Sequence, residues 1–323
     1  MSIIGVKRLV YGVDDIEVST KFFRDFGLDL AHEEPARRVF SLQEGSSVEL
    51  RSAEDTSLPA PFLNGNGPRE VIWGVDTSDA LAKIKDNLSA DREVQVDANG
   101  TLHTRDDCGI AIGFEVFARN LPAFTKSLEN TPTEIQRWNK HRKWFDRARP
   151  KLIFHVVFGV SDVDRGVAFY TQRLNFRLTD INRGLGMFMR CDGRNEHHNL
   201  FLLKSPTTIF SHVSFGVENI DELMAGANQV QRAGWTGGHG TGRHRVSSLA
   251  FFYVKSPAGG QAELSADGDY LTDEWQPRLW GPGYANQHWT GQTAEGAPVP
   301  PEDMEPLTGP IPKLADTIRA PAR

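Results

Sequence analysis

The chain has 323 residues, of which 39% are hydrophobic and 24% are charged, and its formal net charge is −6. This composition is typical of a soluble globular protein and disfavours nucleic acid as its main partner. Two cysteines, Cys108 and Cys191, cannot make a disulfide framework. We expect a cytoplasmic protein without a membrane span, because no signal-peptide-like run and no stretch of about 18 apolar residues occurs.

The first half of the chain alternates strands with helices. We expect strands at 3–13, 38–42, 47–51, 70–75, 102–105 and 110–118, and helices at 17–26 and 77–88. The first helix places Val18, Phe22, Phe23 and Phe26 on one face, and Gly27 follows it as a stop signal. The first half therefore contains two successive units, each with a strand, a helix and further strands.

The second half repeats this order, with sequence similarity to the first. We expect strands at 151–160, 186–191, 198–204, 211–217, 249–256 and 261–265, and helices at 163–174 and 219–233. RLVYGV at 8–13 aligns with HVVFGV at 155–160, and EVIWGV at 70–75 aligns with HVSFGV at 212–217. Internal repeats of this kind predict an α+β protein of two related domains, each a pair of βαβββ units.

The predicted organisation is an N-terminal domain at 1–135, a linker at 136–150, a C-terminal catalytic domain at 151–268 and an arm at 269–323. The basic stretch 137–151 carries Trp138 and Trp144. It could contact an anionic surface or another subunit, but we favour a solvated helix that packs both tryptophans on its neighbours. In the arm, which is rich in Pro, Gly and Trp, we expect regular structure to fade, with a looser end from about Ala294.

Three residues, each alone on an apolar strand, form a candidate metal site. They are His155, His212 and Glu263, the last in the strand GQAEL. The two histidines occupy matching places in sister motifs, so paired strands can bring them together, and a carboxylate on an apolar strand is costly unless it is paired or metal-bound. Two imidazoles and one carboxylate suit Fe(II), Mn(II) or Zn(II) and leave positions open. The alternatives are core histidines and an edge-strand glutamate.

Several further motifs follow in one order: LIFHVVFGV, EHHNLFLL, FSHVSFGV, TGRHRVSSLAFFYVKSPAGGQAEL and DGDY. With them the chain resembles the type I extradiol ring-cleaving dioxygenases of the vicinal oxygen chelate (glyoxalase/bleomycin resistance/dioxygenase) superfamily. The resemblance is specific over about 151–270 and looser in the first half. It implies that each domain is a curved, partly open barrel around a central cavity.

The resemblance also implies roles for individual residues. His155, His212 and Glu263 would hold Fe(II), with Mn(II) as an alternative, and His198 rather than His197 would be the catalytic acid and base. His244 and Tyr253 stand at further catalytic positions: His244 would orient a substrate hydroxyl and Tyr253 would hydrogen-bond the substrate. The alternatives are a surface pair for the adjacent histidines and a core aromatic for Tyr253. The expected partners are an aromatic diol, O2 and further copies of the chain.

The first half departs from the metal-binding pattern. Arg8 and Glu70 stand at the places of His155 and His212, and Glu115 is a possible counterpart of Glu263. An arginine in a ligand's place predicts that no metal binds there. We expect Glu70 and Glu115 to pair with Arg8.

Two other functions were considered. One is a different enzyme of the same superfamily, either a dioxygenase that cleaves a C–C bond of a non-catechol phenol or a glyoxalase-like lyase or isomerase. The other is a metal-free binding or resistance protein, which would not need the metal triad. The stretches 175–187 and 234–242 are expected to border the pocket, but they do not identify the aromatic ring.

Overall fold

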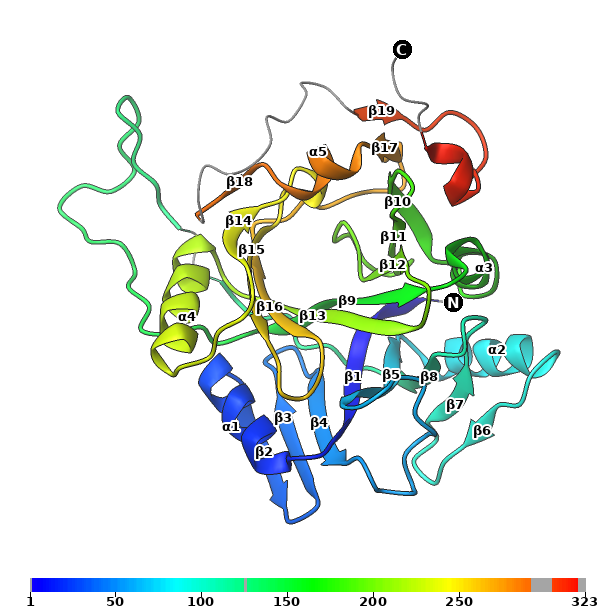
Figure 1. The fold of residues 1–323 in the computed structure, drawn as a ribbon. Helices are drawn as coiled ribbons and strands as arrows, with labels where there is room; N and C mark the ends of the chain where they lie inside the picture. Colours follow the sequence, from blue (N-terminus) through cyan, green and yellow to red (C-terminus); the bar gives the residue numbers. More distant parts are fainter. Residues whose placement is uncertain (1, 125–126, 292–303, 319–323) are drawn as a thin grey trace.

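The computed structural model describes residues 2–124, 127–291 and 304–318 (Figure 1). The first half contains β1 (Ile3–Val13), α1 (Ile16–Phe26), β2 (Asp29–Glu34), β3 (Arg37–Ser41), β4 (Ser47–Ser52), β5 (Gly67–Val75), α2 (Ser78–Ser89), β6 (Gln95–Val96), β7 (Leu102–Arg105) and β8 (Ala111–Val116). No helix in the described parts of the chain is long and apolar enough to cross a membrane.

The second half repeats the series and adds an arm. It contains β9 (Leu152–Val160), α3 (Val163–Ala168), η1 (Phe169–Arg173), β10 (Arg177–Asn182), β11 (Gly186–Arg190), β12 (Leu200–Lys204), β13 (Ile209–Gly216), α4 (Ile220–Arg232), β14 (Gly240–Arg243), η2 (Val246–Ser248), β15 (Ala250–Lys255) and β16 (Gln261–Ala266). The arm contains β17 (Arg278–Trp280), α5 (Pro282–Asn286), β18 (Trp289–Thr290), β19 (Met304–Pro306) and η3 (Leu314–Thr317).

The two halves have the same topology. The first sheet runs β2-β3-β4-β1-β5-β8-β7-β6, and the second contains the matching run β10-β11-β12-β9-β13-β16-β15-β14. In each half the first strands of the two units, β1 and β5 or β9 and β13, pair antiparallel at the centre. The predicted α+β class with two pairs of βαβββ units is confirmed, whereas the predicted domain boundaries stay a prediction.

Within the repeated units, four of the described strands were missed by the sequence analysis, and each follows the helix of its unit. These are β2, β6, β10 and β14. Each ends the run of strands that its own unit contributes, and a terminal strand needs less of the apolar alternation that identifies central strands. β2 reads DLAHEE and is mostly exposed, and β14 reads GTGR. The single α-helix predicted at 163–174 is also wrong, because the α-helix α3 ends at Ala168 and the chain continues as the π-helix η1.

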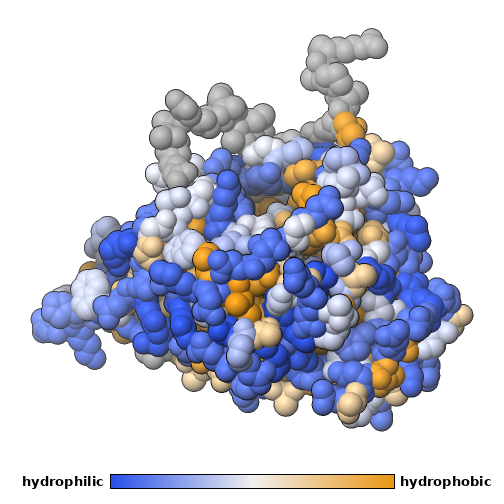
Figure 2. All heavy atoms as spheres, turned by 60° about the horizontal axis from the view of Figure 1, so that its bottom comes forward, coloured by the Kyte–Doolittle hydropathy of each residue, from blue (hydrophilic) through white to orange (hydrophobic). Residues whose placement is uncertain are grey.

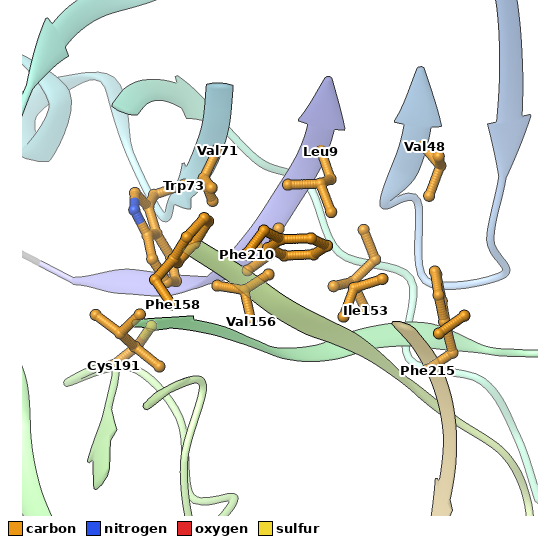
Figure 3. Packing of buried hydrophobic residues seen from close by; sticks show 14 of the residues in the cluster. Leu9, Val48, Val71, Trp73, Ile153, Val156, Phe158, Cys191, Phe210 and Phe215 are labelled. Atoms are coloured by element: carbon orange, nitrogen blue, oxygen red, sulfur yellow. The ribbon is translucent and has the colours of Figure 1, made fainter. Parts of the chain in front are cut away.

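A single hydrophobic core fills the space between the halves (Figure 3). Val156 and Phe158 of β9 face Leu9 and Trp73 from the first half, and Phe215 of β13 packs against Phe26 of α1 with 5.4 Å between ring centroids. Because side chains alternate along a strand, the next residues on β9 face the opposite way. Val157 accordingly belongs to a second, smaller cluster inside the C-terminal sheet. Both faces of the central strands are therefore buried.

The arm has more regular structure than its composition predicts, so the expectation that order fades after Asp267 was wrong. β17 lies parallel to β10 at one end of the matching run, and β18 pairs with β14 at the other end. Between them, α5 crosses the open side of the curved sheet (Figure 1). The looser end expected from Ala294 begins outside the described residues, within 292–303.

The connector between the halves was also predicted wrongly. Among its described residues no helix forms, and Trp138 and Trp144 are 71% and 76% exposed. Lys143 pairs with Glu218, and Arg142 pairs with Glu129 and Asp221. Figure 2 shows a mostly hydrophilic face on which hydrophobic residues form small, separate groups.

Ion pairs fill the place in the first half that corresponds to the predicted metal site. Arg8 Nη2 lies 2.6 Å from Glu115 Oε2, as expected, but Glu70 bonds His103 instead, with 2.8 Å between Oε1 and Nδ1. Strand register also corrects the alignment. Ile72 of β5 and Ser214 of β13 occupy equivalent positions in the two halves. Ser214 pairs with Glu263 of β16, whereas Ile72 pairs with Gly113 of β8. The counterpart of Glu263 is therefore Gly113 and not Glu115.

The shared core predicts the effect of truncating a single aromatic side chain. Phe158→Ala should lower the free energy of unfolding by about 3–5 kcal/mol, because it removes a fully buried ring and leaves a cavity between the halves. Trp138→Ala is the matched control and should change it by less than about 0.5 kcal/mol, since that ring is exposed. Urea unfolding measures both, and similar losses would contradict a core shared by the halves.

Candidate metal centre

Three neighbouring strands bring the predicted ligands together inside the second half. His155 lies on β9, His212 on β13 and Glu263 on β16. His155 Nε2 is 3.1 Å from His212 Nε2 and 3.1 Å from Glu263 Oε2, and His212 Nε2 is 3.5 Å from the same oxygen. Within the described residues, these three form the one cluster of His, Cys, Asp and Glu that could hold a metal ion.

Strand alternation explains why these side chains point inward. Val156, Val213 and Leu264, which neighbour the three ligands along their strands, belong to the core between the halves. The ligands consequently face the interior of the curved sheet. A register shift between Phe210 and His212 helps, because both residues would otherwise share one face of β13.

The donor set fits a divalent cation. Ligand atoms that bind at about 2.1 Å lie about 3.0 Å apart at right angles and about 3.4 Å apart in a tetrahedron. The observed separations of 3.1–3.5 Å span these values. Moreover, Glu263 is fully buried, yet neither of its carboxylate oxygens has a well-formed hydrogen bond. A buried anion in this state requires a cation beside it.

The protonation states point the same way. Burial lowers the pKa of His212 to about 3. Burial opposes the charge of Glu263, but electrostatic interactions with the neighbouring histidines, His155 first, outweigh it and hold the pKa of Glu263 at about 2. At neutral pH the site thus offers a neutral imidazole at His212 and an ionised carboxylate, which are the forms that bind metals.

His198 and His197 lie in the loop before β12 rather than on the strand itself. Both are buried, so a surface pair is excluded for them. The His198 ring lies beside His155, with 4.2 Å between ring centroids, and lines the cavity. His197 points away from the cavity and bonds Asp180, with 2.9 Å between Nε2 and Oδ2. Burial and the nearby histidines lower the pKa of His198 well below its usual value.

His244 and Tyr253 lie on the other side of the ligands. The His244 ring nitrogen Nδ1 bonds the carbonyl oxygen of Asn286, so Nδ1 carries the proton. Nε2 can then accept a hydrogen bond from the Tyr253 hydroxyl, 3.2 Å away. Tyr253 also packs edge-on against His212, with 5.0 Å between ring centroids. The structure therefore brings the predicted site residues together: five of the six line one space, and Glu263 contacts two of these five, His155 and His212.

That space is a cavity of about 380 Å³. It is bordered by five of the six predicted residues, all except Glu263, and by Val157, Leu185, Phe188, Phe201, Leu203, Ser211, His239, Val246, Ser247, Leu249, Phe251, Gln261, Asn286 and Gln287. Leu185 and His239 fall in the two stretches that the sequence analysis placed at the pocket. It missed His239 as a functional residue, although that ring stacks on Tyr253 at 4.2 Å. It also missed Asn286 and Gln287, because nothing in the sequence of the arm indicates where it folds back.

A second, larger cavity of about 1040 Å³ lies in the first half, at the corresponding place. Arg8, Arg37 and Glu49 line it, and Arg37 holds Glu49 with two hydrogen bonds of 2.8 and 3.1 Å. Its charges are thus largely paired with one another, and the described residues there form no metal-binding cluster. The predicted catalytic residues His198, His244 and Tyr253 line the smaller cavity instead.

Comparisons with known proteins agree with this site. The sequence profile of the Glyoxalase/Bleomycin resistance protein/Dioxygenase superfamily matches residues 152–264. Metapyrocatechase 2 of Cupriavidus necator is 30% identical over 269 residues, which cover 80% of this chain and 79% of that protein. The iron-dependent extradiol dioxygenase of Rhodococcus jostii is 31% identical over 147 residues, which cover 39% of this chain and 49% of that protein.

Solved structures show the same fold. The halotolerant catechol dioxygenase BphC superposes with a TM-score of 0.70 at 15% identity, over 95% of this chain and 99% of that chain. The 2,2',3-trihydroxybiphenyl 1,2-dioxygenase of Sphingomonas wittichii has a TM-score of 0.66 at 19% identity, over 90% of this chain and 99% of that one. Together with the curated relatives, they establish that the chain belongs to the extradiol dioxygenases of the glyoxalase/bleomycin resistance/dioxygenase superfamily.

Proposed function

We propose that the chain is an Fe(II)-dependent dioxygenase that opens the aromatic ring of a catechol-type diol beside its two hydroxyls, using both atoms of O2. One observation carries the proposal. Three ligand atoms of His155, His212 and Glu263 converge at 3.1–3.5 Å, and the two histidines line a mostly apolar cavity. Such a facial set leaves coordination positions open toward substrate and oxygen.

The bound cation would take the diol oxygens, lower the pKa of their protons and act as the redox partner of O2. The chain supplies the proton transfers. His198 lines the cavity beside His155, and its lowered pKa keeps the ring neutral and ready to accept a proton at neutral pH. We assign it the removal of a hydroxyl proton and the later return of a proton to the opened product.

Tyr253 and His244 would hold the substrate on the opposite side. His244 is fixed by the arm through Asn286, so its Nε2 presents a lone pair to the Tyr253 hydroxyl or to a substrate hydroxyl. Burial raises the pKa of Tyr253 well above its usual value, so this hydroxyl stays protonated and can donate. Both residues then orient the diol relative to His198.

Apolar side chains shape the rest of the cavity and exclude water. Val157, Phe188 and Phe251 line it, and Phe188 stacks on Phe201 with 3.9 Å between ring centroids. An aromatic ring therefore matches these walls, whereas a charged substituent would lose its solvation there. Mn(II) is the alternative metal. We also propose that the protein forms a homo-oligomer and is located in the cytoplasm.

The activity is tested directly by oxygen uptake. Protein loaded with Fe(II) should consume O2 with at least one of catechol, 3-methylcatechol and 2,3-dihydroxybiphenyl, and it should form a yellow ring-opened product. Protein loaded with Mn(II) is assayed in parallel and decides between the two metals. If neither form consumes O2 with any diol, yet the metal is bound, a non-oxidative reaction of the superfamily takes the place of this proposal.

Removing one ligand tests the metal assignment. Glu263→Gln should weaken Fe(II) binding by more than about 100-fold, because it removes the one anionic ligand. Glu70→Gln is the matched control, since Glu70 stands at the corresponding place of His212 in the first half, and it should bind Fe(II) like wild type. Metal analysis after dialysis measures both variants. Equal iron content in Glu263→Gln and wild type would refute the ligand set.

Removing the base tests the role of His198. His198→Gln should keep the Fe(II) content and substrate affinity of wild type but lower kcat by roughly 10²–10⁴-fold, the usual share of general acid–base catalysis. His103→Gln, a histidine of the first half, serves as the control and should keep wild-type kcat. Unchanged kcat in His198→Gln would show that another group moves the proton.

A further inference from the structure

His198 is the last member of a buried hydrogen-bonded row of three side chains. Asp180 Oδ2 lies 2.9 Å from His197 Nε2, and His197 Nδ1 lies 3.0 Å from His198 Nδ1. Asp180, His197 and His198 are 0%, 1% and 4% exposed. The first two do not line the substrate cavity, so they reach the reaction through His198 alone.

The carboxylate of Asp180 fixes the direction of the hydrogen bonds in this row. The main-chain N–H of Arg278 donates to Asp180 Oδ1 over 2.7 Å, so this oxygen is an acceptor, and Oδ2 faces the histidine. A carboxylate can only accept, so His197 Nε2 must carry a proton. In a neutral imidazole the other nitrogen is then bare, and His197 Nδ1 accepts. His198 Nδ1 must therefore donate, and its Nε2 is left without a proton.

We infer that Asp180 and His197 are positioning residues that hold His198 in the tautomer whose bare Nε2 is free for the substrate. The inference rests on the proposed function, in which His198 is the base. A base works only through an unprotonated nitrogen, and the opposite tautomer would place an N–H where the lone pair is needed. When Nε2 has taken up a proton, the Nδ1–H remains bonded to His197, and the Asp180 carboxylate lies behind the new positive charge.

The surroundings keep this row in place. Phe188 packs edge-on against both rings, with centroid distances of 5.6 Å to His197 and 5.0 Å to His198. The backbone N–H of His197 donates to the carbonyl of Asp269 over 3.0 Å. Asp180 lies on β10 and receives its backbone bond from β17, so the arm that closes the cavity also orients the carboxylate. Neither histidine can rotate without breaking these contacts.

Asp180→Asn should reverse the whole row. The N–H of Arg278 still needs an acceptor, so the amide oxygen stays there and the amide NH2 turns to His197. His197 Nε2 must then accept, its Nδ1 must donate, and His198 Nδ1 must accept. The proton of His198 moves to Nε2, and the base is lost. We expect kcat to fall roughly 10²–10⁴-fold, with KM for the diol and the Fe(II) content unchanged.

Two controls separate positioning from stability. Asp106→Asn makes the same change at another buried aspartate, which accepts bonds from the N–H groups of Cys108 and Ile110 and from Tyr170 in the interface between the halves. It should keep wild-type kcat. At the middle position, His197→Asn retains an oxygen that accepts from His198 Nδ1, whereas His197→Phe does not. The asparagine variant should therefore exceed the phenylalanine variant in kcat by at least about tenfold. Equal values, or wild-type kcat in Asp180→Asn, would overturn the inference.

A spectroscopic measurement is independent of activity. In Zn(II)-loaded protein with ¹⁵N-labelled histidine, nitrogen chemical shifts distinguish a protonated from a bare ring nitrogen. Wild type should show His198 protonated at Nδ1, and Asp180→Asn should show it protonated at Nε2; signals are assigned with His198→Gln. The same tautomer in both proteins would overturn the inference. If no diol supports O2 uptake by wild type, the proposed function fails, while this measurement still decides the tautomer.

Discussion

The structure depends on the burial of both faces of the central strands β9 and β13. One face packs Val156 and Phe215 into the core shared with the first half, and the other presents His155 and His212 to the cavity. Because side chains alternate with a period of two, a slip of one residue would exchange the two faces. It would expose ionisable groups to the apolar core, so the same register that stabilises the fold also places the ligands.

This arrangement gives the first half a structural role. Its central strand β1 carries Arg8 where β9 carries the predicted ligand His155, and Arg8 pairs with Glu115 of β8. It nevertheless supports the catalytic loop, because Ile3 and Ile4 accept hydrogen bonds from Gly193 and Arg194, each over 3.1 Å. The loop that carries His198 is thus bonded to the first half. The presence of Arg8 in a copy of the β9 strand also shows that the strand does not need a histidine to fold.

The arm completes the site from the other side. β17 and β18 extend the second sheet beyond β10 and β14, and α5 between them carries Asn286 to His244. The arm also supplies the backbone bond that orients Asp180. The arm therefore holds His244 directly, and it holds His198 indirectly through Asp180 and His197. The composition of this segment nevertheless indicates little order.

Repetition made much of the fold and site predictable. The duplicated motifs around His155 and His212 predicted that the chain is built from paired βαβββ units. The pairing of these units in turn predicted that the two histidine side chains converge. Where no repeat or periodicity existed, prediction failed: the edge strand β14, the exposed connector around Trp138 and the folded arm depend on contacts distant in sequence.

The sequence by itself singled out the predicted metal ligands, because an isolated polar residue on an apolar strand can be recognised without knowing the fold. It could not determine that Glu115 falls out of register with Glu263, since register is set by pairing between strands. Nor could it show that His197 turns away from the cavity to Asp180, 17 positions earlier in the chain. Tertiary structure decided those points, because hydrogen-bond direction depends on which donor and acceptor meet in space.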